Sequence, residues 1–210
     1  MNEINRKNFI FAEKIQLTIS SKRILDTITL KIPHGLTVIT GENGAGKSTL
    51  LKILGKILQP SKGNIIYNNQ KLKEYSSFMF QEPIFLNRTI NDNLQHALRC
   101  FNGNFKTSYQ SMIVSYLKQF NISHLLNMYP DTLSVGEKKI ISYIRSIIVS
   151  PKIIFLDEPC AHLDMNNQKT ISNHINKLSN SIPIVIVAHK NELNLYNITQ
   201  SIKIDGGNLI

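Results

Sequence analysis

The sequence has only two cysteines, Cys100 and Cys160, and no long apolar run. Two separated cysteines are too few for a disulfide framework or a cysteine-rich metal cluster, so we expect a cytoplasmic protein. The apolar run PIVIVA at 183–188 has the length of a strand and falls far short of the roughly 20 residues that cross a bilayer. The N-terminal MNEINRKNFIF lacks an apolar stretch followed by a cleavage site, so we expect no signal peptide.

Acidic residues are scarce: 14 Asp and Glu oppose 24 Lys and Arg, which gives a formal net charge of +10. Nucleic acid, an anionic membrane surface or solubility alone could account for such a balance. The lysines are scattered and form no dense run with interleaved aromatic residues. Because such clustering marks nucleic-acid-binding proteins, we expect no specific nucleic-acid partner.

The first part of the chain reads as short β-branched segments separated by polar turns. Segments 8–13, 15–19 and 27–32 predict an antiparallel β layer, and LTVIT at 36–40 predicts a buried strand. NIIYNNQ at 64–70 and SSFMFQ at 76–81 predict further strands around an NNQ turn.

The spacing of apolar residues changes after Gln81, where helical patterns without a convincing strand begin. Strand–helix alternation resumes at residue 137 and ends in a short strand pair around DGGN at 205–208. Continuous apolar strands that alternate with helices predict a parallel sheet covered on both faces. We therefore expect a single α/β domain over 1–210, with residues 1–81 and 137–210 forming the core and 82–136 an inserted helical subdomain.

GENGAGKS at 41–48 fits G-x-x-x-x-G-K-[ST] and lies between a predicted strand and a predicted helix over 48–58. The glycines let backbone N–H groups surround phosphates, the helix N-terminus adds positive potential, and Lys47 reaches the terminal phosphates. A glycine-rich turn that binds nothing is the alternative, but the complete motif in this context favours nucleotide binding. The predicted nucleotide-binding residues are Gly41, Glu42, Asn43, Gly44, Ala45, Gly46, Lys47, Ser48 and Thr49.

Acidic and polar residues follow three predicted strands. IIFLDEP at 153–159 ends a strand in Asp157, a candidate Mg²⁺ ligand with Ser48, and Glu158, a candidate general base. His189 ends the strand IPIVIVA, and Gln81 ends SSFMF; its amide is a candidate ligand of Mg²⁺ or of the attacking water. Taken alone, each of these signals also fits a solvated strand end.

LSVGEKK at 133–139 predicts a helix start, with Ser134 as N-cap and Glu137 completing a capping box. With the motifs above and AHLD at 161–164, the chain resembles an ATP-binding cassette (ABC) protein, specifically a transporter ATPase subunit. GENGAGKS resembles Walker A, Gln81 the Q-loop, LSVGEKK the signature, IIFLDEP Walker B, AHLD the D-loop and His189 the switch histidine. The resemblance spans nearly the whole chain and implies a P-loop NTPase (RecA-like) core.

The resemblance implies ATP and Mg²⁺ as ligands and a head-to-tail dimer of two copies of the chain. Ser134 and Gly136 would then bind the γ-phosphate held by the partner, and Asp164 would link the two sites. Glu158 would act as base, with His189 and Gln81 positioning water and phosphate. The implied partners are an integral-membrane permease, contacted near 81–90 at the inner face of the membrane, and, for an importer, a solute-binding protein.

Several residues depart from the pattern of the family. Ile19 stands where an aromatic ring usually stacks on adenine, with Tyr67 and Phe11 as candidate substitutes. Val135 replaces a glycine of the signature, and Lys139 and Ile140 replace the Gln-Arg that commonly ends it. Cys160 replaces Thr or Ser, and His162 is bulky for the D-loop. These departures bear on nucleotide affinity and rate rather than on hydrolysis itself.

QEPIFLNRTINDNL at 81–94 resembles the Q-loop region of importer ATPases for inorganic oxyanions, such as the tungstate and phosphate families. The shortness of the chain suits that group and also the haem-exporter, lipoprotein-release and cell-division subunits. Transported solutes contact other chains, so both an oxyanion importer and these alternatives remain open, among them a non-transport ATPase coupled to a membrane partner.

Overall fold

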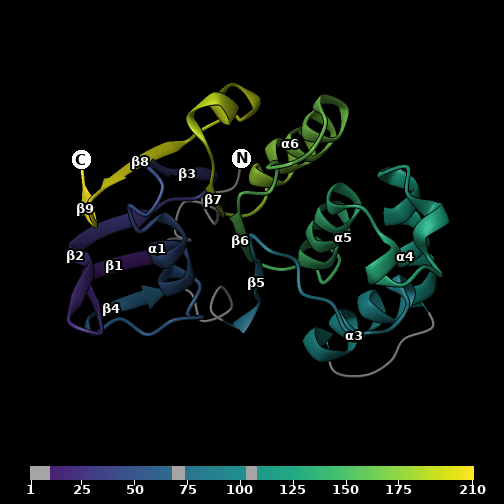
Figure 1. Cartoon of the computed structure of the whole chain (residues 1–210), viewed down its shortest axis with the longest axis horizontal. Coiled ribbons are helices and arrows are strands. Elements are labelled where there is room, and N and C mark those ends of the chain that lie inside the picture. Colours follow the sequence, from purple (N-terminus) through teal and green to yellow (C-terminus); the bar gives the residue numbers. More distant parts are fainter. Residues whose placement is uncertain (1–9, 68–73, 103–107) are drawn as a thin grey trace.

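The structure, a computed structural model, describes residues 10–67, 74–102 and 108–210. An antiparallel sheet near the N-terminus has the order β2-β1-β4 (Figure 1). Its strands are β1 (Ile10–Ile19), β2 (Lys22–Ile32) and β4 (Lys62–Tyr67). The predicted β layer is therefore present.

Two details of this sheet differ from the prediction. The segments 8–13 and 15–19 form one strand within the described residues, because Lys14 takes a φ of 49° and is accommodated as a bulge. Residues 8 and 9, and the NNQ turn at 68–70, lie outside the described residues. β4 and β5 do not pair across that turn, since they belong to different sheets.

The second sheet has the order β5-β6-β7-β3-β8-β9 and is parallel from β5 to β8. The final strand β9 runs antiparallel to β8, as the DGGN turn predicts. The strands are β3 (Leu36–Gly41), β5 (Ser76–Met79), β6 (Ile153–Asp157), β7 (Ile184–Val187), β8 (Gln200–Asp205) and β9 (Asn208–Leu209). The predicted α/β class with a parallel sheet is confirmed.

Both faces of the parallel sheet are buried, which explains why its strands are continuously apolar. Phe155 on β6 packs into a core shared with α1 and the first sheet. Its neighbours Ile154 and Leu156 point the other way, into a core shared with the helices. Each fully buried side chain of this size stabilises the fold by about 1.5–3 kcal/mol.

Helix α1 (Lys47–Leu54) covers one face of the sheet and is shorter than the predicted 48–58. Gly55 caps it, donating to the carbonyls of Ile53 and Leu51. Lys56 then takes a left-handed φ of 56°, which ends the helix although the apolar periodicity continues.

The described elements between β5 and β6 are all helical. They are α3 (Ile90–Asn102), α4 (Ser108–Gln119), the 3₁₀ turns η2 (Ser123–Leu125) and η3 (Pro130–Thr132), and α5 (Val135–Ile147). Figure 1 shows α3, α4 and α5 together on the side of the molecule opposite the first sheet. Among the described residues no helix is long and apolar enough to cross a membrane.

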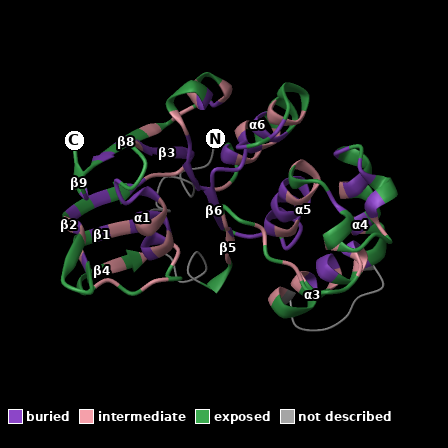
Figure 2. Cartoon of the chain, in the orientation of Figure 1, coloured by how far each residue is buried: buried purple, intermediate pink, exposed green. Residues whose placement is uncertain are grey.

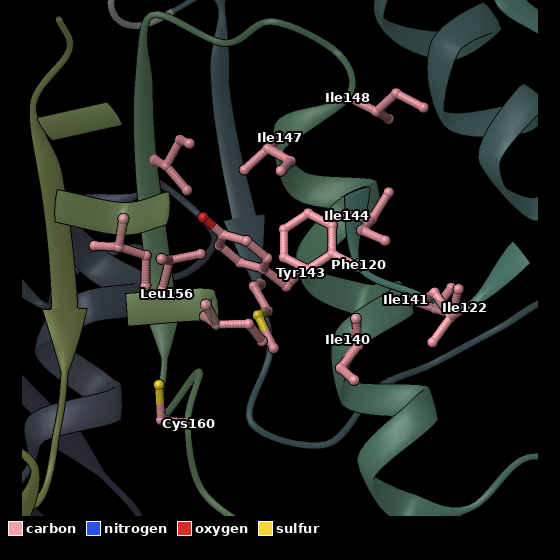
Figure 3. Close-up of a cluster of buried hydrophobic side chains, with 14 of the residues drawn as sticks. Phe120, Ile122, Ile140, Ile141, Tyr143, Ile144, Ile147, Ile148, Leu156 and Cys160 are labelled. Carbon is pink, nitrogen blue, oxygen red and sulfur yellow. The ribbon is translucent and has the colours of Figure 1, made fainter. Parts of the chain in front are cut away.

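Helix α5 is the main contact between these helices and the parallel sheet. Its Tyr143 is fully buried and packs edge-on against Phe120 (Figure 3). The Tyr143 hydroxyl also forms a hydrogen bond of 2.8 Å with His174 Nδ1 on α6 (Met165–Ser179). Burial is concentrated on the inner face of α5 and on the central strands (Figure 2). Tyr143 thereby ties α5 to α6 and to the end of α4.

Candidate active site

The loop after β3 has three glycines with positive φ: Gly41 at 151°, Gly44 at 80° and Gly46 at 102°. A Cβ on Gly41 would lie 2.1 Å from the carbonyl oxygen of Ile204, and one on Gly46 would lie 2.7 Å from Leu25 Cδ2. Neither position has room for a side chain. The glycines therefore allow a tight loop that leads directly into the N-terminus of α1.

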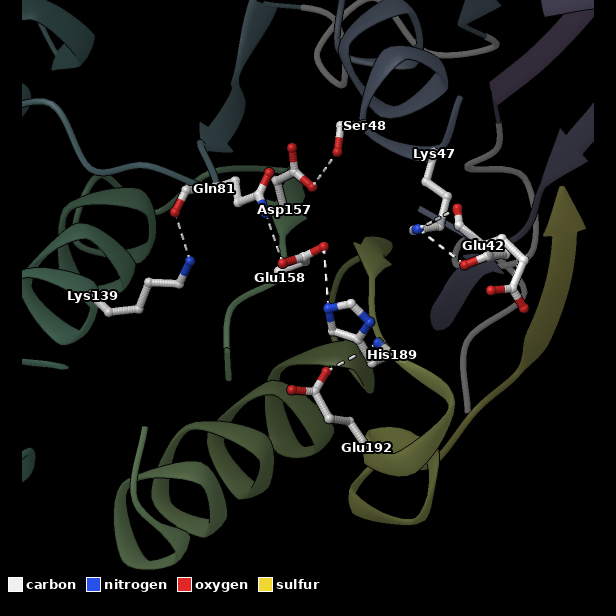
Figure 4. Close-up of polar contacts among 10 residues, drawn as sticks. Glu42, Lys47, Ser48, Gln81, Lys139, Asp157, Glu158, His189 and Glu192 are labelled. Atoms are coloured by element: carbon white, nitrogen blue, oxygen red, sulfur yellow. Dashed lines mark hydrogen bonds and ion pairs between the residues drawn. The ribbon is translucent and has the colours of Figure 1, made fainter. Parts of the chain in front are cut away.

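Lys47 is folded back onto this loop. It is 6% exposed, and its Nζ donates to the carbonyl oxygens of Gly41 and Glu42, each at 3.0 Å (Figure 4). The ammonium thus lies over the cradle in which phosphates bind in loops of this sequence. A phosphate oxygen is a stronger acceptor than these carbonyls, so the residues present fit a nucleotide.

Ser48 and Asp157 meet beside the loop. The Ser48 hydroxyl donates to Asp157 Oδ1 at 2.9 Å. Burial raises the pKa of Asp157, and the Ser48 hydrogen bond opposes that shift. A hydroxyl and a carboxylate oxygen at one place are the hard ligands that Mg²⁺ prefers, so the predicted pair fits this ion.

Glu158 follows β6 in a left-handed conformation, with a φ of 50°. Such a backbone is strained for a residue with a Cβ and is often found at functional sites. This conformation places the Glu158 carboxylate, which is only 6% exposed, between two predicted residues. Gln81 Nε2 donates to Glu158 Oε2 at 2.9 Å. On the other side, His189 Nε2 lies 3.4 Å from Glu158 Oε1. The structure therefore brings together the three residues that the sequence predicts as catalytic.

His189 is itself held in place by Glu192, which the sequence reasoning missed. Glu192 lies in the 3₁₀ helix η4 (Lys190–Leu195), and its Oε2 accepts a hydrogen bond of 3.1 Å from the His189 backbone N–H. The sequence does contain a signal for this contact, because an acidic residue stands three positions after the histidine.

A hollow of about 300 Å³ joins the loop to Gln81 and Glu158. It is lined by Ile24, Asn43, Gly44, Gly46, Lys47, Ser48, Thr49, Gln81 and Glu158. The apolar member, Ile24 on β2, was not predicted. Ile19 is 52% exposed and does not line the hollow. Tyr67 is unsuited to replace it, because its hydroxyl donates to the Leu54 carbonyl at the opposite end of α1.

The predicted capping box at the start of α5 is present. Ser134 Oγ accepts from the Glu137 N–H at 3.3 Å, and Glu137 Oε2 accepts from the Ser134 N–H at 2.8 Å and from its hydroxyl at 2.7 Å. The Glu137 N–H is consequently used within the capping box. Val135 is 64% exposed beside them.

Ser134 and Gly136 do not line the hollow around Glu158. Gly136 instead lies beside the segment 161–164, where a Cβ on it would be 3.5 Å from Leu163 Cδ2. Asp164 caps α6, its Oδ1 accepting from the N–H groups of Asn166 and Asn167 at 2.9 Å. One chain therefore presents the phosphate loop and the capped helix start as two separate surfaces.

Comparison with known proteins identifies the family. The ABC transporter family model matches residues 25–161. The chain belongs to the ABC transporter family. The ATP-binding protein LolD of the lipoprotein-releasing system of Buchnera aphidicola subsp. Schizaphis graminum is 34% identical over 182 residues, which cover 80% of each chain. The phosphate import ATP-binding protein PstB of Saccharolobus solfataricus is 31% identical over 196 residues, covering 84% of this chain and 76% of the relative.

The ABC fold is also found in solved structures. A dimeric ATP-binding cassette bound to ADP and phosphate, in a post-hydrolysis state, aligns with a TM-score of 0.85 and 22% identity, covering 95% of this chain and 96% of that one. This likeness confirms the predicted P-loop NTPase fold with its β layer and helices. As an ABC transporter ATP-binding subunit, the chain is an ATPase, in agreement with the prediction.

Proposed function

We propose that this ABC ATPase works as a head-to-tail pair of identical chains that hydrolyses ATP with Mg²⁺ and drives a separate membrane permease. One observation supports this most directly: Gln81, Glu158 and His189 gather at the phosphate loop, whereas the capped start of α5 lies on another surface of the same chain. A second chain packed head-to-tail against the first would bring its Ser134 and Gly136 to the phosphates bound at the loop of the first chain.

The residues of the hollow then have distinct roles in hydrolysis. Lys47 exchanges its loop carbonyls for phosphate oxygens, and the backbone N–H groups of residues 41–49 surround them. Ser48 and Asp157 would hold Mg²⁺, with the Gln81 amide as a further ligand. When bound, the ion would neutralise charge on the phosphates. Glu158 accepts the proton of the attacking water, which His189 and Gln81 orient.

In the proposed dimer, Asp164 links the two nucleotide-binding sites. Its carboxylate fixes the first turn of α6 immediately after the segment that lies against Gly136. Movement at one signature helix would thereby reach the neighbouring D-loop.

The proposed permease docks beside the Q-loop, which places the ABC subunit peripherally at the inner face of the cell membrane. A groove of about 290 Å³ lies between β5, α3 and α5, with Phe101 and Arg145 among its lining residues. Ile84 and Leu86 in the adjacent segment are 70% and 41% exposed. Exposed apolar side chains beside a groove suit a short helix of a membrane protein.

For the transported solute we propose import of a small inorganic oxyanion with the help of a solute-binding protein. The likeness to the phosphate import protein and the Q-loop sequence at 81–94 support this class. Lipoprotein release is the second candidate, because the likeness to LolD covers 80% of both chains. Copurification from the native cell decides between them: a permease with a solute-binding protein supports import, and a permease without one contradicts it.

A complementation experiment tests the shared site. Lys47→Ala removes the phosphate contact of one chain. Ser134→Arg in the other chain blocks its signature surface, which is the capped start of α5 with Ser134 and Gly136. Each variant alone should be inactive, whereas mixing them should restore ATP hydrolysis, because one of the two sites in a mixed dimer is built from intact halves. Co-elution of a tagged chain of one variant with the untagged chain of the other is the control for subunit exchange. Absence of recovery, with exchange demonstrated, would refute the head-to-tail arrangement.

A further inference from the structure

Lys139 is a buried cation that the roles described above leave unused. It lies on α5 and is only 2% exposed. Burial lowers the pKa of Lys139, and the nearby carboxylates of Glu158 and Asp157 oppose that shift. A buried ammonium is unfavourable unless it is hydrogen-bonded and close to opposite charge, so the position points to a specific role.

The hydrogen bond that Lys139 makes leads to the catalytic group. Its Nζ donates to the backbone carbonyl oxygen of Gln81 at 2.7 Å (Figure 4). The side chain of the same Gln81 donates to Glu158 Oε2 at 2.9 Å. Gln81 is thus held at its backbone by α5 and at its amide by the candidate base.

The other end of this connection is the signature surface. Lys139 and Ser134 lie at the start of the same helix, and the capping box holds Ser134 rigidly to that first turn. Tyr143, further along α5, is fully buried in the core. A displacement of the helix start is therefore transmitted to the Gln81 carbonyl through one hydrogen bond rather than absorbed by a loose side chain.

We propose that Lys139 is a positioning residue that fixes Gln81, and through it Glu158, to the helix whose start serves the partner's nucleotide. The proposal rests on the proposed function for the roles of Gln81 and Glu158. As a consequence, binding of the partner's nucleotide at the start of α5 is linked to the position of Glu158 in the same chain. The bond needs a donor at residue 139, and the positive charge adds an attraction to the two buried carboxylates.

The charge of Lys139 also has a separate effect on Mg²⁺. Asp157 is 1% exposed and Glu158 is 6% exposed, so Lys139 partly neutralises two adjacent buried carboxylates. A cation already near them weakens their attraction for a second cation. Replacement by a neutral donor should therefore lower the Mg²⁺ concentration that supports half-maximal hydrolysis, by about threefold.

The first test uses the full chain without nucleotide. Hydrogen–deuterium exchange is measured over residues 80–86 in wild type, Lys139→Met, Lys139→Gln and the matched control Lys138→Met. Because Lys139 binds a carbonyl rather than an amide, its loss acts on exchange by letting the segment open more often: Lys139→Met should speed exchange there by about three- to tenfold, the effect of one hydrogen bond. Lys139→Gln keeps a donor and should restore protection, and Lys138→Met should match wild type. Equal exchange in all four proteins would overturn the proposal.

The second test separates positioning from general stability. Lys139→Met should lower kcat for ATP hydrolysis by about tenfold or more, as misplacement of a reacting group does, while KM for ATP changes little because residues 41–49 are untouched. Lys139→Gln should recover most of kcat and show the shifted Mg²⁺ dependence. The proposal is contradicted if Lys139→Gln has a kcat well below that of wild type and the same Mg²⁺ dependence as wild type. This comparison is with wild type and therefore holds even if Lys139→Met does not fold.

Failure of the proposal and failure of the proposed function give different results. If the wild-type chain hydrolyses ATP and the Lys139 variants exchange and turn over as wild type does, only the role of Lys139 is refuted. If Glu158→Gln hydrolyses ATP normally while Lys139→Met still loosens residues 80–86, the connection exists and the assignment of the base is wrong.

Discussion

Gln81 and Glu158 are joined by a hydrogen bond of 2.9 Å between the amide Nε2 of one and the carboxylate Oε2 of the other. The bond connects the segment after β5 to the turn after β6, two neighbouring strands of the parallel sheet. It leaves the second oxygen of Glu158 facing His189 at 3.4 Å. The candidate base is therefore oriented from two sides by the chain itself.

Glu158→Gln should abolish ATP turnover and trap an ATP-bound dimer. The amide retains the size of the carboxylate and cannot accept a proton, so the rate should fall by about 10²–10⁴-fold. Phosphate release and size-exclusion chromatography with ATP measure the two effects. Glu13→Gln on β1, an exposed site in the first sheet, serves as the matched control. Turnover near the wild-type rate in Glu158→Gln would show that another group is the base.

Ser134→Ala should destabilise the chain by about 1 kcal/mol, because α5 loses its N-cap hydrogen bond. Ser134→Thr keeps a hydroxyl and should lose much less. Urea unfolding of the two variants measures the difference. ATP hydrolysis should fall in Ser134→Ala as well, and a variant that is destabilised yet fully active would argue against a phosphate contact of this hydroxyl.

Glu137 should make stability depend on pH in the acid range. Hydrogen bonds from the Ser134 hydroxyl and N–H hold the pKa of Glu137 below its ordinary value of 4.5. Its contribution is fully present above that ordinary value and is lost as the pH falls through the lowered value of the folded chain. The difference in free energy of unfolding between wild type and Glu137→Gln should accordingly shrink on acidification below pH 4.5. A constant difference down to the acid unfolding transition would contradict this sign.

Ile19→Tyr should tighten ATP binding. Ile19 is 52% exposed at the end of β1, at the position where the family usually has an aromatic ring. Stacking of a base on an aromatic side chain contributes about 1–3 kcal/mol, so KM for ATP should fall by about fivefold or more. Ile66→Tyr on β4, at the other edge of the sheet from β2 and 48% exposed, is the control. An equal effect of both substitutions would mean that the gain is not made at the adenine.

Two glycines of the phosphate loop should respond differently to alanine. Gly41→Ala places a Cβ 2.1 Å from the Ile204 carbonyl oxygen, and we expect a loss of about 3 kcal/mol in stability. Gly44 has open space around it, so Gly44→Ala should cost only the roughly 1–2 kcal/mol of a left-handed conformation. Thermal unfolding of the nucleotide-free chain measures both, and equal losses would contradict the close approach at Gly41.

Features that depend on neighbouring residues were predictable from the sequence. The capping box of Ser134 and Glu137 and the glycine-rich turn before α1 are local, and both are present. The end of α1 was predicted too late because Gly55 lies within an otherwise continuous apolar pattern. Local periodicity does not register such a cap.

Features that depend on distant contacts were missed. Ile24 reaches the hollow because β2 lies beside the loop, and nothing near Ile24 in the sequence indicates this. Lys139 looks like a surface residue of a helix start, yet it is buried by the approach of the segment at Gln81. The separation of β4 and β5 into two sheets likewise depends on the whole fold.

The resting place of Lys47 has a consequence for the energetics of nucleotide capture. Its ammonium already uses two of its three N–H donors on the carbonyls of Gly41 and Glu42, so an arriving phosphate takes up the third donor and replaces the partners of the other two. For those two donors the net gain is the difference between bonds to an anionic phosphate and bonds to uncharged carbonyls, not the full strength of the new bonds. Affinity measured for ATP therefore understates how strongly this lysine holds the bound phosphate.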